Sequence, residues 1–109
     1  MRPGFLAGLA MFAQAVLADS PTPERQRALL ELLHQDCGSC HGMTLQGGLG
    51  PALLPSALEN KSAAVLTATI LQGRPGTAMP PWSSLLTQPE AEWLVTQLKQ
   101  PASTRNVTP

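Results

Sequence analysis

The residues with the clearest chemical meaning lie at positions 37–41, where the sequence is Cys-Gly-Ser-Cys-His. Two thiols in the C-x-x-C-H spacing lie about one helical turn apart and can add to the two vinyl groups of one porphyrin. The histidine that follows then lies against the iron as an axial ligand. The pattern therefore predicts one haem c, attached covalently through Cys37 and Cys40, with His41 as the first axial ligand.

Three other kinds of site use similar residues. A thioredoxin-like redox pair also contains C-x-x-C, but it lies near a β-α-β pattern, and this sequence has no such alternation. A zinc site could combine Cys37, Cys40, His41 and His34, yet structural zinc sites draw their ligands from two separated pairs. A disulfide between Cys37 and Cys40 would close too small a loop to stabilise the fold much. Haem attachment is the interpretation that accounts for both cysteines and the histidine without a second pair of ligands.

The second axial position decides the function, because a vacant site admits ligands whereas a filled site favours electron transfer. Met79 is the expected sixth ligand, since the chain between it and His41 is long enough to pass around the ring. Its loop, residues 73–82, contains several turn-forming residues, and two prolines restrict the backbone after Met79. The alternative is that Met79 only fills an apolar gap.

The other possible ligands are less suitable. Met43 lies too close to His41 to reach the opposite haem face, and His34 lies on the side of the attachment site. Met1 and Met11 belong to a segment that we expect to be removed.

That segment, residues 1–18, has the layout of a secretory signal peptide. Arg2 precedes an apolar run over residues 5–18, and the run ends in small residues before Asp19. A retained anchor is the alternative, but the run is shorter than the roughly 20 residues that a spanning helix needs. We predict cleavage after Ala18, a periplasmic location and no membrane association thereafter. The haem domain would span residues 19–100, and residues 101–109 would form a flexible tail.

Composition and pattern predict an all-α fold. Lys plus Arg and Asp plus Glu are balanced at seven each, which argues against a nucleic-acid partner. Thr22 and Pro23 begin a helix that should run into the haem motif. Residues 62–72 predict a second helix that ends at Gly73, with Val65, Leu66, Thr69 and Ile70 on one face. Thr87 and Glu90 match a capping box at the start of the last helix.

Residues 42–56 are rich in glycine and proline and predict a loop rather than a regular element. A loop of this length in a small domain is expected to wrap something. We expect it to cover the proximal haem face, with Leu49, Leu53 and Leu54 as its wall. The exposed haem edge should lie between this loop and the loop that ends at Trp82. Both loops are poor in charge, with Arg74 the exception, which favours apolar, transient docking of redox partners.

The arrangement of these motifs resembles the class I c-type cytochromes over about residues 22–100. The resemblance rests on C-G-S-C-H after an N-terminal helix, on G-L-G-P-A-L, and on a later methionine in a proline-rich loop before a final helix. It implies that the first and last helices cross. It also implies that the carbonyl of Pro51 accepts a hydrogen bond from His41, which orients the ring and increases its basicity. The family usually has an aromatic residue where this chain has Gln97.

Residues 36–82 more particularly resemble the small periplasmic cytochromes of the c-55X type, which are encoded beside the cytochrome cd1 nitrite reductase of denitrifying bacteria. The resemblance implies a periplasmic role in denitrification. We expect a monomeric electron carrier, not an enzyme. Its partners would be the nitrite reductase or a protein that matures the d1 haem of that enzyme. Two alternatives stay open: a five-coordinate haem protein that binds or senses ligands, and an assembly factor for d1 haem whose redox activity is incidental.

Overall fold

A computed structural model describes residues 20–105, and these residues contain helices, turns and loops but no strand. The predicted signal peptide and the last four residues of the predicted tail lie outside them. The helices in chain order are α2 Pro23–Leu32, η1 Leu33–Cys37, α3 Gly38–His41, α4 Pro55–Leu58, α5 Ala63–Gln72, α6 Gln88–Leu98 and η2 Ala102–Thr104. The all-α prediction is confirmed for the described residues, among which no helix is long and apolar enough to cross a membrane.

The N-terminal helix carries the haem motif. Thr22 caps it by accepting a hydrogen bond from the backbone N–H of Arg25 at 3.1 Å, and Pro23 occupies its first turn. The helix then passes through one π-helical segment, η1, in which the N–H of Gly38 bonds to the carbonyl of Leu33. This wider turn was not predicted. Helix α3 continues to His41 and ends at Gly42, whose φ of 94° is a left-handed conformation that favours glycine.

The last two long helices pack against each other. Ser62 caps α5, which ends at Gly73 as predicted. Leu66 and Ile70 of α5 pack against the core, but Val65 on the same predicted face is 58% exposed. The capping box predicted for Thr87 and Glu90 is present at the start of α6.

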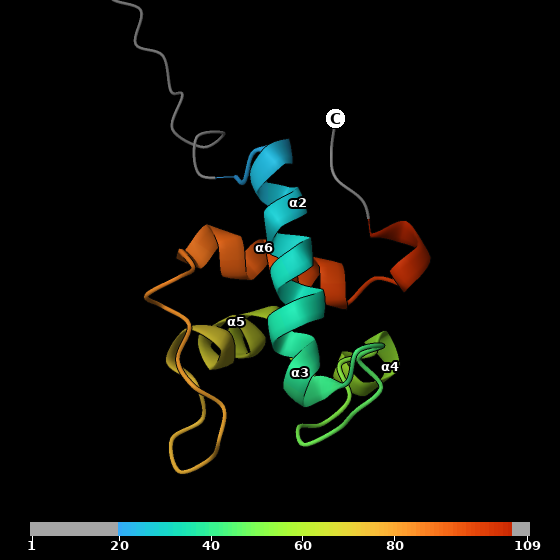
Figure 1. The fold of residues 1–109 in the computed structure, drawn as a ribbon, viewed down its shortest axis with the longest axis vertical. Helices are drawn as coiled ribbons and strands as arrows, with labels where there is room; N and C mark the ends of the chain where they lie inside the picture. Colours follow the sequence, from blue (N-terminus) through green and yellow to red (C-terminus); the bar gives the residue numbers. More distant parts are fainter. Residues whose placement is uncertain (1–19, 106–109) are drawn as a thin grey trace, which may run out of the picture.

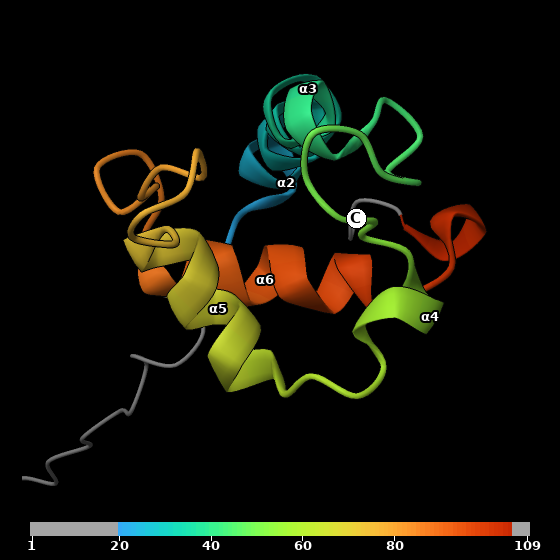
Figure 2. The same cartoon turned by 90° about the horizontal axis from the view of Figure 1, so that it is seen from below.

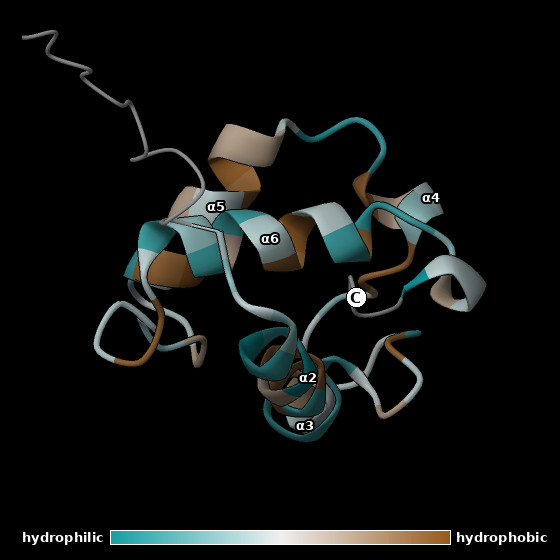
Figure 3. Cartoon of the chain, turned by 90° about the horizontal axis from the view of Figure 1, so that it is seen from above, coloured by the Kyte–Doolittle hydropathy of each residue, from teal (hydrophilic) through white to brown (hydrophobic). Residues whose placement is uncertain are grey.

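Helix α2 crosses α6, and the core lies around this crossing (Figures 1 and 2). Figure 3 shows α2 nearly end-on, with both hydrophilic and hydrophobic positions around its axis. The buried core consists of leucines from several elements: Leu29, Leu33, Leu45, Leu58, Leu86, Leu94 and Leu98. Trp93 and Trp82 are partly buried against it.

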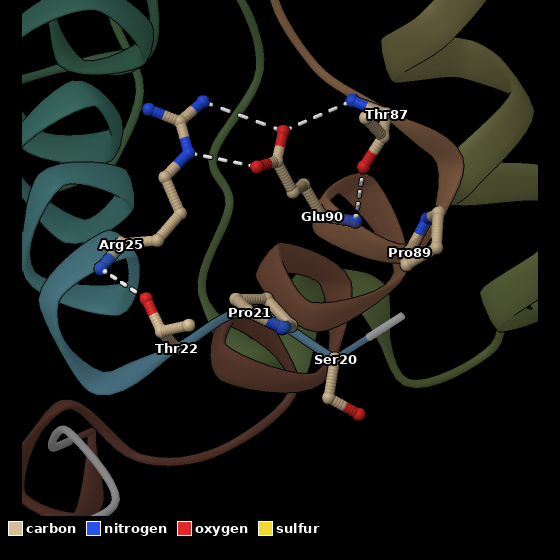
Figure 4. A pocket seen from close by; sticks show the side chains of 7 residues that line it. All are labelled: Ser20, Pro21, Thr22, Arg25, Thr87, Pro89 and Glu90. Carbon is tan, nitrogen blue, oxygen red and sulfur yellow. Dashed lines mark hydrogen bonds and ion pairs between the residues drawn. The ribbon is translucent and has the colours of Figure 1, made fainter. Parts of the chain in front are cut away.

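An ion pair joins α2 to the start of α6 (Figure 4). Arg25 donates from Nε to Glu90 Oε2 at 2.7 Å and from Nη2 to Oε1 at 3.3 Å. The same Oε1 accepts from the backbone N–H of Thr87 at 3.0 Å, so the capping box and the ion pair share one carboxylate. The hydrogen bonds from Arg25 hold the pKa of Glu90 below its ordinary value. The surrounding hollow, of about 370 Å³, is open and is lined by these residues and by Ser20 to Thr22.

The C-terminal end of the described chain folds back on α6. Residues Ala102–Thr104 form a 3₁₀ turn, and Arg105 donates from Nε to the carbonyl of Gln97 at 2.7 Å. Part of the segment that we expected to be a tail is thus hydrogen-bonded to the last helix.

Candidate haem-binding site

The two cysteines of the motif lie at the junction of η1 and α3. Cys37 is partly buried, Cys40 is exposed, and both are free thiols. Burial raises the pKa of Cys37 to about 11, and the neighbouring Asp36 and Cys40 add to the rise. Ser39 donates from its hydroxyl to the carbonyl of Asp36 at 2.8 Å, which supports the turn between the cysteines. The helix therefore presents two unpaired thiols three residues apart, about one helical turn.

His41 is the last residue of α3, and its imidazole is held from one side. The Nδ1 of His41 lies 2.7 Å from the carbonyl oxygen of Pro51. With Nδ1–H as the donor, the other ring nitrogen, Nε2, keeps its lone pair for a metal.

Gly50, the residue before Pro51, lies directly against the same ring. A Cβ added to Gly50 would lie 2.8 Å from His41 Cε1 and 2.9 Å from Nδ1, closer than side-chain carbons approach. The absence of a side chain at Gly50 thus allows the carbonyl of Pro51 to reach His41. Sequence reasoning selected Pro51 and missed Gly50, because nothing in the order of residues indicates which glycine meets the ring.

The loop between α3 and α4 is tied to the motif by backbone hydrogen bonds. The N–H of Gly50 donates to the carbonyl of Cys40 at 2.7 Å, and the N–H of Gly47 donates to the carbonyl of His41 at 2.8 Å. Leu45 is fully buried in this loop and anchors it in the core. The irregular loop predicted over residues 42–56 is present, except that Pro55 begins the short helix α4.

Met79 lies in the second loop, between α5 and α6, and is partly buried. The N–H of Arg74 donates to the carbonyl of Met79 at 3.2 Å, and the hydroxyl of Thr77 accepts from the N–H of Met79 at 3.3 Å. Figures 1 and 2 show that this loop and the loop after α3 flank α3 on opposite sides. The candidate ligands His41 and Met79 thus belong to segments that lie around the same end of the first helix.

The predicted pocket residues differ in exposure. Leu53 and Trp82 are partly buried and pack against the core. The backbone N–H of Trp82 donates to the carbonyl of Ile70 at 3.0 Å, which ties the methionine loop to α5. Leu49, by contrast, has 94% of its surface exposed in the polypeptide, and Met43 in the same loop has 61%.

The donor set fits a covalent haem better than the alternatives. Within residues 20–105, no group of three or more His, Cys, Asp or Glu side chains is arranged to hold a metal ion, which argues against the zinc site. The absence of strands in the same residues argues against a thioredoxin-like fold. Two free thiols and an oriented imidazole are the groups that haem c attachment requires.

Comparisons with known proteins agree with this assignment. Residues 24–96 match the family described as cytochrome c oxidase, cbb3-type, subunit III. A cytochrome c55X from Pseudomonas aeruginosa is 58% identical over 83 residues, which are 75% of this chain and 70% of the relative. A solved structure of the c-type cytochrome NirC is 57% identical, with a TM-score of 0.72, and the match covers 72% of this chain and 93% of that chain.

The chain belongs to the cytochrome c55X family of c-type cytochromes. The small class I cytochrome c fold is thereby confirmed, and membership implies a covalently bound haem c. A second solved structure, described as dihydro-heme d1 dehydrogenase NirN in complex with DHE, is 39% identical with a TM-score of 0.61. That match covers 66% of this cytochrome but only 16% of the other chain. A cytochrome of this kind therefore also occurs as a small part of a longer chain.

Proposed function

We propose that this cytochrome carries one haem c, attached through Cys37 and Cys40, with His41 and Met79 as axial ligands, and that it transfers single electrons. The observation that carries the proposal is the 2.7 Å contact between His41 Nδ1 and the carbonyl of Pro51. This contact fixes the ring orientation and leaves Nε2 for the iron. When bound, the haem supplies a one-electron ferrous–ferric couple, and the residues around it set the potential.

The roles of the chain's own residues follow from their positions. Met79 is backed by a proline-restricted loop with hydrogen bonds to both of its backbone polar groups, which suits a ligand that stays bound in both oxidation states. A filled sixth position excludes exogenous ligands and favours electron transfer over ligand sensing. The loop that carries Met79 and the loop that contacts His41 thus serve to keep the positions of the two axial ligands constant.

The surface around the site favours apolar partners. Residues 42–58 and 75–89 contain no charged side chain, and Met43 and Leu49 expose most of their surface. Small redox interfaces are transient and bury little area. We propose that electrons enter and leave between these two loops, and that docking depends on apolar contact more than on charge. Electron transfer would then slow little as salt is added, because salt mainly screens charged contacts.

The partner is proposed from the relatives. The similarity to cytochrome c55X, to NirC and to the dehydrogenase NirN supports a place in denitrification. The partner would be the cytochrome cd1 nitrite reductase or a protein that matures its d1 haem. We also propose that the protein is exported, cleaved after Ala18 and active as a periplasmic monomer.

Anaerobic stopped-flow mixing tests the proposal. The reduced cytochrome is mixed with oxidised nitrite reductase, and the oxidised cytochrome is mixed with a d1 haem dehydrogenase and its substrate. We expect fast, nearly salt-independent electron transfer with at least one partner, and loss of transfer in Met79→Ala. A high-spin ferric spectrum of the wild-type protein, together with rapid carbon monoxide binding after its reduction, would instead indicate the ligand-binding alternative. A stable complex with a maturation protein that is unaffected by Met79→Ala would indicate the assembly factor.

The attachment is tested separately by mass. The purified holoprotein should keep one haem per chain after acid and denaturant, and the mature chain should begin at Asp19. A haem that is extracted from the wild-type protein by acidified organic solvent would contradict covalent attachment.

A further inference from the structure

Gly73 lies at the end of α5 in a conformation that other residues avoid. Its φ is 70° and its ψ is −171°, a combination that is almost restricted to glycine. Gly73 is buried, and its N–H donates to the carbonyl of Thr69 at 2.8 Å. The helix end alone would explain a glycine here, but the surroundings of Gly73 indicate a second role.

The space beside Gly73 is filled by backbone atoms of Met79, Pro80 and Pro81. A Cβ added to Gly73 would lie 2.7 Å from Pro80 C, 2.7 Å from Pro81 N and 2.8 Å from Met79 O. None of these atoms belongs to a flexible side chain that could move aside. Proline also fixes its own φ, so the segment can yield only by moving as a unit.

The methionine loop has few ways to absorb such a movement, because hydrogen bonds hold its backbone on both sides of this contact. The N–H of Arg74 donates to the carbonyl of Met79 at 3.2 Å. Beyond the prolines, the N–H groups of Trp82 and Ser83 donate to the carbonyls of Ile70 and Leu71 at 3.0 Å and 3.2 Å. A side chain at position 73 would therefore displace the backbone of Met79 itself.

We propose that Gly73 is a positioning residue for Met79: its missing side chain lets the methionine backbone rest directly on the end of α5. This inference rests on the proposed axial role of Met79. A displaced backbone would move the thioether away from the iron, because the side chain is carried by the same residue whose carbonyl contacts Gly73.

Gly76 provides a matched control within the same loop. It also has a positive φ, of 82°, but an added Cβ would meet no atom within 4 Å. Gly76→Ala therefore reproduces a positive-φ substitution in the loop without the collision, whereas Gly73→Ala introduces both.

The experiment compares the ferric near-red sulfur-to-iron band, the rate of carbon monoxide binding and the thermal unfolding of the holoproteins. For Gly73→Ala we expect a weakened band and carbon monoxide binding faster by about tenfold, the ratio that about 1.4 kcal/mol of lost ligation produces. On heating Gly73→Ala, the near-red band should disappear at a temperature lower than that at which the variant unfolds. For Gly76→Ala we expect an unchanged band at temperatures where the chain is folded. Equal bands in the two variants, or a band in Gly73→Ala that is lost only on unfolding, would overturn the inference.

A second variant covers the case in which Gly73→Ala does not fold. Pro81→Gly frees the backbone that the methyl group of Ala at position 73 would meet. The double variant that combines Gly73→Ala with Pro81→Gly should therefore fold, with a weaker near-red band than Pro81→Gly alone. If neither variant carrying Ala at position 73 folds while Gly76→Ala does, Gly73 serves the fold alone and the proposal is wrong. The wild-type protein and Met79→Ala separate the two proposals, because a wild-type spectrum that Met79→Ala leaves unchanged would refute the axial role itself.

Discussion

Replacing Gly50 with alanine should change the electronic properties of His41 although neither proposed ligand is itself substituted. The added Cβ would lie 2.8 Å from Cε1 and 2.9 Å from Nδ1 of the imidazole, so the ring or the loop must move by several tenths of an ångström. No unusual φ is involved, so backbone strain does not obscure the result. The movement should lengthen the 2.7 Å contact between Nδ1 and the carbonyl of Pro51.

The magnitude follows from what that hydrogen bond contributes. Donation from Nδ1–H increases the basicity of the imidazole, which stabilises the ferric form more than the ferrous form. A hydrogen bond contributes about 0.5–1.5 kcal/mol net, which for a one-electron couple corresponds to about 20–60 mV. Gly50→Ala should therefore raise the reduction potential by about that amount.

Spectroelectrochemical titration at neutral pH measures this shift, with Gly38→Ala as the control. Gly38 lies inside the haem motif, but a Cβ there would make ordinary contacts, 3.5 Å from the Cα and sulfur of Met43. We expect no shift in the control beyond experimental error. A potential that stays unchanged or falls in Gly50→Ala, or an equal rise in both variants, would refute the role assigned to Gly50.

Three further predictions concern other parts of the structure. Glu90→Gln should lower the free energy of unfolding at neutral pH by about 1 kcal/mol, because the ion pair with Arg25 is partly exposed and modest in strength. The pKa of Glu90 is lowered in the folded chain, so this contribution is present above the carboxylate's unfolded pKa. The stabilisation should be lost as the pH falls through the pKa of Glu90 in the folded chain. Denaturant titrations of the wild type and Glu90→Gln at several pH values measure this, and a difference in unfolding free energy that does not change with pH would contradict the prediction. Thr77→Val should weaken the near-red band and Thr77→Ser should restore it, since the hydroxyl bridges the carbonyl of Arg74 and the N–H of Met79; identical spectra in the two variants would contradict this. Cys37→Ala should leave a haem held by one thioether, visible as a red-shifted reduced spectrum, and an unchanged spectrum would argue against attachment at Cys37.

Much of the helical framework could be predicted because it is determined locally. Caps at Thr22 and Thr87 and the stop at Gly73 follow from hydrogen bonds within a few residues, and each is present. The haem motif likewise lies within five consecutive residues. Local chemistry of this kind is encoded in the order of residues, whatever the rest of the chain does.

Features that depend on contacts between distant segments could not be predicted. The ion pair between Arg25 and Glu90 joins two helices whose relative position is set only by packing. The contacts of Gly50 with His41 and of Gly73 with the methionine loop are equally non-local. Val65 is exposed although its helical spacing groups it with Leu66 and Ile70, because periodicity does not determine how wide the covered face is.

The central claim is that Met79 occupies the sixth position of a haem held at the motif. Proton NMR of the reduced holoprotein tests it most directly, because the ring current of the haem shifts the methyl protons of a bound methionine far upfield of all ordinary side-chain signals. We predict one such upfield methyl resonance in the wild-type protein and its loss in Met79→Ala, with the signal of Met43 unaffected. A reduced spectrum without an upfield methionine methyl, or one whose upfield methyl persists in Met79→Ala, would contradict the assignment and the electron-transfer function built on it.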